Sequence, residues 1–243
     1  MKKLFDFFGS FFLLIIFFIP LFIISILIFL QDYKAPFYFA PRVSKGGSLF
    51  TMIKLRTMIH NADSNKVDST KADDIRITKI GYFVRKFKLD ELAQLINVFN
   101  GTMSFVGPRP QVKRDVDIYT EEEKKILLAK PGITDFSSIV FSDESHILSG
   151  SSNPDLKYNQ LIRPWKSRLV IFYINNQSII LDIKLILLTV YNFLNREKTL
   201  QHISNILKNM EADEKLINVV LRKDQLIPYP PPGSLEIVTD RII

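Results

Sequence analysis

Cysteine is absent from this 243-residue sequence, and histidine is scarce. The absence of cysteine excludes disulfide bonds, thiol nucleophiles and cysteine-ligated metal sites. The three histidines are widely spaced, at His60, His146 and His202. A zinc site built from histidine is therefore disfavoured, and the composition is compatible with a reducing compartment such as the cytosol.

The motifs of several common enzyme classes are also missing. The sequence has no GxxxxGK followed by Ser or Thr, and no GxGxxG, GxSxG or HExxH pattern. Walker-type ATPases, dinucleotide-dependent enzymes, lipases of the usual pattern and zinc proteases are accordingly disfavoured. Lysine and arginine outnumber aspartate and glutamate by 32 to 25. This excess suits an anionic partner, but it does not distinguish a phospholipid headgroup from a nucleotide phosphate or a nucleic acid.

One apolar segment is long enough to cross a bilayer. Residues 11–30 carry no charge, and about 20 such residues span the hydrocarbon core as a helix. No small-residue cleavage site follows, which disfavours a cleaved signal peptide. Pro20 interrupts the segment and should kink it. Basic residues, which mark the cytoplasmic side, flank both ends: Lys2, Lys3, Lys34, Arg42 and Lys45. The residues alone leave open a re-entrant helix that returns to the same face and an ordinary single span.

The segment after the apolar helix contains one predicted strand and one predicted helix. Alternation over residues 48–58 indicates a strand that projects Lys54 and Arg56 to the same side. That pair could hold a diphosphate or could simply face solvent. Apolar residues at helical spacing predict a helix over residues 89–100, with Gly101 as its C-terminal cap. The polar stretch at residues 60–74 between them is predicted to be a loop or an irregular helix.

Adjacent carboxylates, Asp90 and Glu91, open this predicted helix. The positive end of the helix dipole would keep Asp90 ionised, and an ionised carboxylate can attack phosphorus. In isolation, however, such a pair is more often a helix cap. Arg109 lies between Pro108 and Pro110, so its backbone is stiff and its guanidinium suits phosphate oxygens. Arg85 precedes the acidic pair closely and has the same potential role.

The C-terminal part of the sequence contains a second apolar segment and a polar tail. Residues 178–194 include Asp182 and Lys184, which are costly in lipid, so a buried or interfacial helix is expected there. Beyond residue 197 the chain becomes amphipathic and then proline-rich. Aromatic and basic residues cluster beside the membrane segment, which favours a membrane surface over nucleic acid as their partner.

Three sequence blocks resemble those of bacterial sugar transferases, the small monotopic phosphoglycosyl transferases. They are KLRTM at residues 54–58, KLDELAQLINVFNGTMSFVGPRP at residues 88–110 and KPGIT at residues 130–134. The order also resembles the family, from the N-terminal apolar segment to an apolar helix that bears LDIK. The resemblance covers about residues 1–195, and the central block is long and specific.

The resemblance implies a reaction and its site. Asp90 would attack the sugar-bearing phosphate of a UDP-sugar, UMP would leave, and polyprenyl (undecaprenyl) phosphate would take the sugar phosphate from the enzyme. Mg²⁺ would assist, and Glu91 would bind it or activate the lipid phosphate. The remaining assignments are phosphate binding by Lys54, Arg85 and Arg109, a less defined polar role for Asp182, and a helix break at Pro20. The family also favours the re-entrant topology, with the catalytic domain on the cytoplasmic face of the bacterial inner membrane.

The expected architecture is therefore a mostly helical α/β domain with a short sheet, preceded by a kinked membrane helix. The expected boundaries are residues 1–33 for the membrane helix, 34–197 for the catalytic domain and 198–243 for an extension without a recognised counterpart. Ala93 replaces the family's usual proline. Residues 135–138 also depart from the family, and Arg163 is a guess for a basic residue expected after them. The partners would be a UDP-sugar, the lipid phosphate and membrane lipid, with a homodimer left open.

Two other functions compete with this hypothesis. A non-catalytic, membrane-anchored protein that binds anionic lipid or a partner would explain the charge and the apolar segment. It would leave the dense block at residues 88–110 unexplained. A hydrolase that passes the sugar phosphate to water would use similar residues but form no lipid product.

Overall fold

The computed structural model describes residues 1–62, 70 and 74–240. Most of the predicted loop at residues 60–74 thus lies outside the described residues. The domain is mostly helical with two small sheets, as the sequence predicts. Its elements in chain order are α1 Lys2–Asp32, β1 Phe37–Val43, η1 Lys45–Gly47, β2 Leu49–Leu55, α2 Lys79–Lys86, η3 Leu89–Gln94, α3 Leu95–Phe99, β3 Ser104–Val106, α4 Lys113–Asp117, η4 Glu123–Leu128, β4 Gly132–Thr134, α5 Phe136–Val140, α6 Glu144–Ile147, α7 Pro154–Leu161, α8 Arg163–Asn175, α9 Ile179–Tyr191, α10 Arg196–Asn209 and α11 Glu214–Val220.

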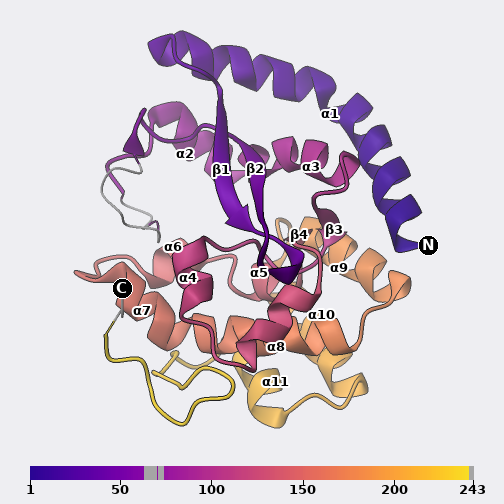
Figure 1. Ribbon diagram of the computed structural model, residues 1–243, viewed down its shortest axis with the longest axis vertical. Coiled ribbons are helices and arrows are strands. Elements are labelled where there is room, and N and C mark those ends of the chain that lie inside the picture. The colour runs from indigo at the N-terminus through magenta and orange to yellow at the C-terminus, as the bar shows by residue number, and fades with distance from the viewer. Residues whose placement is uncertain (63–69, 71–73, 241–243) are drawn as a thin grey trace.

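Helix α1 is one continuous helix that contains Pro20, and its axis bends along the edge of the molecule (Figure 1). Among the described residues it is the one helix long and apolar enough to cross a membrane. Its buried residues include Asp6 and Ser10, whereas most of its large apolar side chains are exposed. Asp6 accepts a hydrogen bond from the backbone N–H of Phe105 at 3.1 Å. Asp6 and Ser10 thus face the protein, whereas most of the apolar surface of α1 faces outward.

The C-terminal half of α1 packs on the segment that carries the acidic pair. Ile24 and Ile28 form an apolar cluster with Leu55 of β2, Val84 of α2 and Ala93 of η3. The alanine that replaces the family's usual proline is therefore fully buried against this half of the helix. The cluster fixes the position of η3 relative to β2 and α1.

The two sheets join distant motifs of the sequence. Strands β1 and β2 form an antiparallel hairpin with Phe37 opposite Leu55 and Val43 opposite Leu49. Strands β3 and β4 are parallel, which places the segments on either side of residues 107–131 side by side. The predicted strand is confirmed as β2, whereas the predicted helix over residues 89–100 consists of the 3₁₀ turn η3 followed by the short helix α3. Gly101 has φ 74°, in agreement with a helix-capping role.

The extension beyond residue 197 shares the main hydrophobic core. Leu200, Ile203 and Leu207 of α10 are buried in the same cluster as Trp165 and Leu169 of α8. Helix α11 adds Leu216, Ile217 and Val220 to this cluster. In Figure 1, α11 and the tail lie on the far side of the molecule from α1. The core therefore continues across the boundary expected at residue 197.

Candidate active site

The turn that carries Arg109 is fixed on both sides by close backbone contacts. Gly107 and Gly132 are so near each other that a Cβ on Gly132 would lie 2.1 Å from the nitrogen of Gly107. The carbonyl of Pro108 accepts a hydrogen bond from Gly132 at 2.9 Å, and the carbonyl of Gln111 accepts one from β1 at 2.9 Å. The VGPRP and KPGIT motifs thus meet through their glycines and hold Arg109 in place.

Asp90 and Glu91 lie in the first turn of η3 and face two basic side chains. The Lys54 Nζ of β2 is 3.6 Å from Asp90 Oδ2 and 3.8 Å from Glu91 Oε1. Arg109 Nη2 is 2.9 Å from Glu91 Oε1. Lys88, directly before the turn, has φ 52°, a left-handed backbone that is unusual for a residue with a side chain. The structure therefore brings four predicted site residues, Lys54, Asp90, Glu91 and Arg109, to one centre.

Asn97 links the acidic pair to the strand that carries Lys54. Its Oδ1 accepts a hydrogen bond from the N–H of Ile53 at 2.9 Å, and its Nδ2 donates to the carbonyl of Thr51 at 2.8 Å. Because the buried Asn97 amide satisfies these two backbone groups of β2, it fixes the strand relative to η3 and α3. The strand that carries Lys54 and the turn that carries the two carboxylates are therefore held at a fixed separation.

The charges at this centre are strongly coupled. Burial alone would raise the pKa of Glu91, but Arg109, Lys54 and Lys88 outweigh it and lower that pKa to about 2. Glu91 in turn raises the pKa of Arg109 above its usual value. Burial, reinforced by Arg109, lowers the pKa of Lys54. Glu91 is therefore ionised at physiological pH and holds the cations near Asp90.

Arg85 of α2 is oriented by a conventional hydrogen bond. Its Nε donates to Thr57 Oγ1 at 2.8 Å. Burial lowers the pKa of Arg85, and the charge of Asp90 acts in the opposite direction. The helix lies close to the Thr57 backbone because Gly81 has no side chain, since a Cβ there would lie 1.9 Å from the Thr57 oxygen. Arg85 is thus within electrostatic range of Asp90, as its sequence position suggested.

Two other predicted residues lie away from this centre and anchor the ends of α1. The Arg56 guanidinium forms two 2.6 Å contacts with Asp32, and its Nε donates to the Ala35 carbonyl at 2.8 Å. Arg56 follows the last residue of β2, so strand alternation does not control its direction, and it does not join Lys54. Asp182 forms an ion pair with Lys2 and accepts a hydrogen bond from Tyr173 at 2.6 Å. The structure gives both residues anchoring contacts at the ends of α1, and substrate binding by them stays a prediction.

Arg163 is also placed differently from its tentative sequence assignment. Its guanidinium is buried with Glu123, to which Nε donates at 3.0 Å, and Nη1 donates to Asn159 at 3.1 Å. Its Nη2 also donates to the Ile118 carbonyl at 2.7 Å. Ser167 donates a further hydrogen bond to Glu123 at 2.7 Å. Because these groups satisfy one another, the arginine serves to join α8 to η4.

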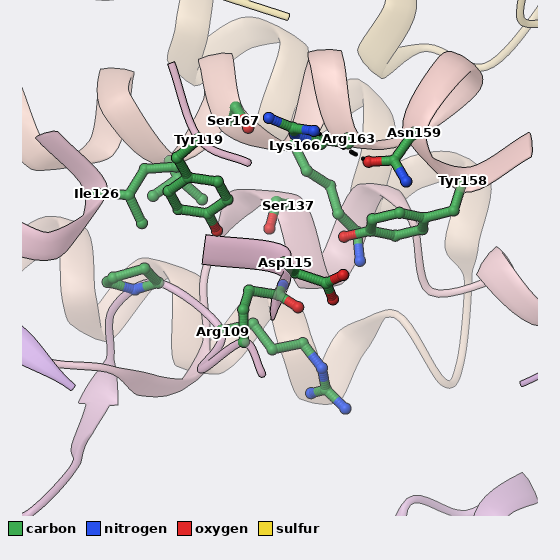
Figure 2. Close-up of a pocket in the computed structure, with 13 residues that line it drawn as sticks. Arg109, Asp115, Tyr119, Ile126, Ser137, Tyr158, Asn159, Arg163, Lys166 and Ser167 are labelled. Carbon is green, nitrogen blue, oxygen red and sulfur yellow. Dashed lines mark hydrogen bonds between the residues drawn. The ribbon is translucent and has the colours of Figure 1, made fainter. Parts of the chain in front are cut away.

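A small cavity that is open to solvent begins beside Arg109 (Figure 2). Its wall includes Tyr119, Ser137, Tyr158 and Lys166. Figure 2 shows the Lys166 amine beside the Tyr158 ring and the Arg109 guanidinium pointing away from the other labelled side chains. Sequence analysis missed Lys88, Lys166 and Tyr158 as site residues. Lys88 stands within the KLDEL block, so its position was a usable signal, whereas the other two lie in a stretch without a recognised motif.

The carboxylates at this centre can contribute to a magnesium site but cannot complete one. Within residues 1–62, 70 and 74–240, no group of three or more His, Cys, Asp or Glu side chains is placed to hold a metal ion. Mg²⁺ is commonly bound by one or two carboxylates together with phosphate oxygens of a substrate. Asp90 and Glu91 face a common point near Lys54 and fit such a shared arrangement.

Comparison with known proteins identifies the family. A sequence model of the family described as "Bacterial sugar transferase" matches residues 1–196. The chain belongs to this family. All four residues of the charged centre lie inside the matched range, and α11 with the tail lies beyond it. The family assignment from the sequence blocks is thus confirmed.

Several named relatives are similar to this family member. The "Uncharacterized sugar transferase EpsL" of Bacillus subtilis (strain 168) is 33% identical over 190 residues, which cover 78% of this chain and 85% of EpsL. The "UDP-galactose-lipid carrier transferase" of Erwinia amylovora is 34% identical over 149 residues, covering 55% of this chain and 31% of that protein. The "UDP-N-acetylgalactosamine-undecaprenyl-phosphate N-acetylgalactosaminephosphotransferase" of Aeromonas hydrophila is 29% identical over 156 residues, covering 61% and 36%. The chain thus spans about a third of the latter two.

Proposed function

We propose that this protein transfers a sugar phosphate from a UDP-sugar to a polyprenyl phosphate, such as undecaprenyl phosphate, and releases UMP. The observation that carries the proposal is the convergence of Asp90 and Glu91 with Lys54 and Arg109. Two relatives whose names state lipid-carrier or undecaprenyl-phosphate transfer support it. The product would start assembly of a surface glycan or a glycoprotein.

Asp90 is the proposed nucleophile. One of its carboxylate oxygens attacks the phosphorus that carries the sugar, and the bond from that phosphorus to the UMP oxygen breaks. UMP leaves with the bonding electrons, and the sugar phosphate remains on Asp90 as an acyl phosphate. An oxygen of the polyprenyl phosphate then attacks the same phosphorus and releases the carboxylate. Atoms and charges balance without a further reactant.

The basic residues stabilise the charge that develops on the phosphate groups. Lys54 and Arg109 are held near Asp90 by Glu91, so they are in position before the substrate binds. The planar Arg109 fork suits two phosphate oxygens. Mg²⁺, held by Glu91 and phosphate oxygens of the donor, would supply further neutralisation. Loss of UMP release in EDTA and its return with Mg²⁺ would support that role, whereas full activity in EDTA would contradict it.

Helix α1 is proposed to be re-entrant, because both of its ends are bound to one domain. Lys2 at its start contacts Asp182, Tyr173 and the Val106 carbonyl. Asp32 at its end is paired with Arg56. A helix anchored at both ends to one cytoplasmic domain returns to the face that it entered. Its exposed apolar side chains would lie in the inner leaflet of the inner membrane, and η3, which packs on it, would lie near the lipid phosphates.

The lack of cysteine allows a direct test of this topology. Lys3→Cys and Lys45→Cys introduce single thiols in the first turn of α1 and after its end. Neither should react with a membrane-impermeant maleimide in intact spheroplasts, and both should react after permeabilisation. Labelling of the residue 3 thiol alone in intact spheroplasts would show a full span and contradict the re-entrant topology.

The covalent step is tested by intact-protein mass spectrometry with a UDP-sugar and no lipid acceptor. The wild-type protein should gain the mass of one sugar phosphate, and Asp90→Asn should gain none. Asp117→Asn is a matched control, because it makes the same carboxylate-to-amide change at an exposed surface pair with Lys113. Turnover by Asp90→Asn at the wild-type rate would exclude this nucleophile.

Addition of polyprenyl phosphate separates the proposed function from its two competitors, because transfer should yield a lipid product. Free sugar phosphate without a lipid product would indicate a hydrolase, and the absence of UMP release would indicate a non-catalytic binding protein.

A further inference from the structure

Lys166 lines the cavity beside Arg109, and the proposed reaction leaves this lysine and its ion-pair partner Glu144 without a role. Lys166 of α8 forms an ion pair with Glu144, the first residue of α6. The Lys166 side chain is 10% exposed and that of Glu144 is 32% exposed. The Lys166 amine also lies 5.6 Å from the centre of the Tyr158 ring. A largely buried lysine is costly unless it is paired or binds a ligand, so this arrangement is a built feature of the cavity.

The pair lies within electrostatic range of the acidic centre. The charge of Glu144 contributes to the raised pKa of Arg109, after the larger effect of Glu91. Burial lowers the pKa of Lys88 most, Glu91 opposes this shift, and Arg109 and then Lys166 add to it. The cavity also includes the side chain of Arg109 in its wall. A ligand whose phosphate contacts Arg109 can therefore extend into the cavity toward Lys166.

The groups in the cavity suit hydroxyl groups better than they suit phosphate. A carboxylate such as Glu144 accepts hydrogen bonds from sugar hydroxyls but repels a phosphate dianion. Lys166 donates hydrogen bonds to hydroxyl or acyl oxygens. Burial and the nearby charge of Glu144 raise the pKa of Tyr158 well above its usual value, so its phenol remains a donor. Lys166 and Tyr158 in the cavity wall, together with Glu144 beside them, therefore offer both donors and an acceptor, which suits a polyhydroxylated ring.

We infer that the Glu144–Lys166 pair binds the sugar of the donor and determines which sugar is accepted. The inference rests on the proposed function, in which the attacked phosphorus is bonded to the sugar. When that phosphate lies between Asp90 and Arg109, the sugar is joined to it through one bridging oxygen. The sugar then reaches the cavity beside Arg109. The nucleotide, which leaves from the opposite side of the phosphorus, lies elsewhere.

The C-terminal extension holds this pair in position. Asp143, the neighbour of Glu144, is paired with Arg196 at 3.0 Å and with Arg222 at 3.3 Å. The Arg222 guanidinium also lies 5.1 Å from the centre of the Phe141 ring. Arg222 stands beyond the residues matched by the family model. This chain therefore uses its own extension to fix the start of α6, and Arg222 is a positioning residue for Glu144.

The decisive experiment compares donor selectivity with nucleotide affinity in the full-length protein. UMP release is measured with a panel of UDP-sugars for the wild type, Glu144→Gln and Lys166→Met, and UMP binding is measured separately. We expect the ratio of kcat/KM between the preferred and the next sugar to change at least about tenfold, with UMP affinity within about twofold of wild type. Glu121→Gln and Lys124→Met are matched controls at an exposed ion pair and should leave both quantities unchanged.

The outcomes separate this inference from the proposed function. If the wild type releases UMP from no UDP-sugar, the proposed function fails and this inference falls with it. If the wild type is active but both variants keep its selectivity, only the inference is overturned. A uniform loss for every sugar together with weaker UMP binding would assign the cavity to the nucleotide and overturn the inference as well.

A second pair of variants tests the positioning role of Arg222. Arg222→Leu should change the same selectivity ratio in the same direction as Glu144→Gln, by about threefold because the contact is indirect. Arg222→Lys retains the charge opposite Asp143 and should therefore keep most of the wild-type selectivity. Wild-type selectivity in a folded Arg222→Leu protein would overturn the positioning role.

Discussion

Two carboxylate–arginine pairs in this protein differ in how completely their hydrogen-bonding groups are used. The Glu123–Arg163 pair has side chains that are 0% and 6% exposed, and its groups bond to one another, to Asn159 and to Ser167. In the Glu91–Arg109 pair the arginine side chain is 34% exposed and contacts the carboxylate through one nitrogen. The first pair is closed, whereas the second leaves donors of Arg109 exposed.

The difference separates a structural ion pair from a candidate catalytic one. A closed pair can accept no ligand without losing bonds that it already has. An open pair is held in place by one contact and keeps other donors for a substrate. By this criterion Arg109, and not Arg163, is the candidate for phosphate binding. The following changes test that distinction, beginning with the largest expected effect.

Glu123→Gln should cost the most stability. The substitution leaves Arg163 charged, buried and without its counterion, which typically costs about 3–5 kcal/mol. Chemical unfolding of the detergent-solubilised protein measures the change. Glu121→Gln, at an exposed carboxylate, should change stability by about 0.5 kcal/mol or less. A loss below about 1 kcal/mol in Glu123→Gln would show that the pair is not the closed structural contact described.

Arg109→Ala should cost activity instead of stability. Removal of one charge-stabilising donor typically lowers kcat about 10²–10³-fold, and we expect a smaller loss of unfolding free energy than in Glu123→Gln, because Arg109 is partly exposed and Lys54 and Lys88 still neutralise Glu91. Steady-state UMP release and chemical unfolding should be measured on the same preparation. A variant that unfolds easily yet turns over normally would reverse the assignment of the two arginines.

The difference in unfolding free energy between the wild type and Glu91→Gln should depend on pH. The folded-state pKa of about 2 lies below the ordinary value of 4.5, so the ionised carboxylate contributes stability that is present above about pH 4.5 and is lost as pH falls toward 2. Such a shift corresponds to a contribution on the order of 3 kcal/mol. Unfolding of wild type and variant should be compared between pH 2 and 7. A gap that is constant over this range would contradict the coupling of Glu91 to Arg109, Lys54 and Lys88.

Gly132→Ala tests whether the position of Arg109 depends on the glycine contact. The added Cβ would meet backbone atoms of Gly107, so the chain must shift, at a cost of about 1–3 kcal/mol. We expect lower activity in addition, because the displaced turn carries Arg109. Wild-type stability and UMP release in this variant would show that the contact is not required.

Local patterns in the sequence predicted much of the site. The alternating strand placed Lys54, the acidic pair opened a helical turn as expected, and the two prolines marked the Arg109 turn. These features depend on short-range geometry, which the sequence encodes directly. The family blocks connected them, although the close approach of Gly107 and Gly132 that joins two of the blocks could not be read from spacing.

The contacts that the sequence did not predict join residues far apart in the chain. Arg56 pairs with Asp32, and Arg163 pairs with Glu123, 40 residues away. No local pattern shows that an arginine already has a buried partner. Likewise, the polar sequence of the extension hid the apolar face by which α10 and α11 join the core.

The contact between Lys2 and Asp182 spans 180 residues, and this has a consequence for biosynthesis. Ribosomes make the apolar helix well before Asp182, the residue that binds its start, because 180 residues separate Lys2 from Asp182. Under the proposed topology, the helix meets the membrane long before its first turn can be anchored. The returning path of the helix is therefore enforced late, by the folding domain, and a chain truncated before Asp182 would lack the anchor that keeps its N-terminus on the cytoplasmic side.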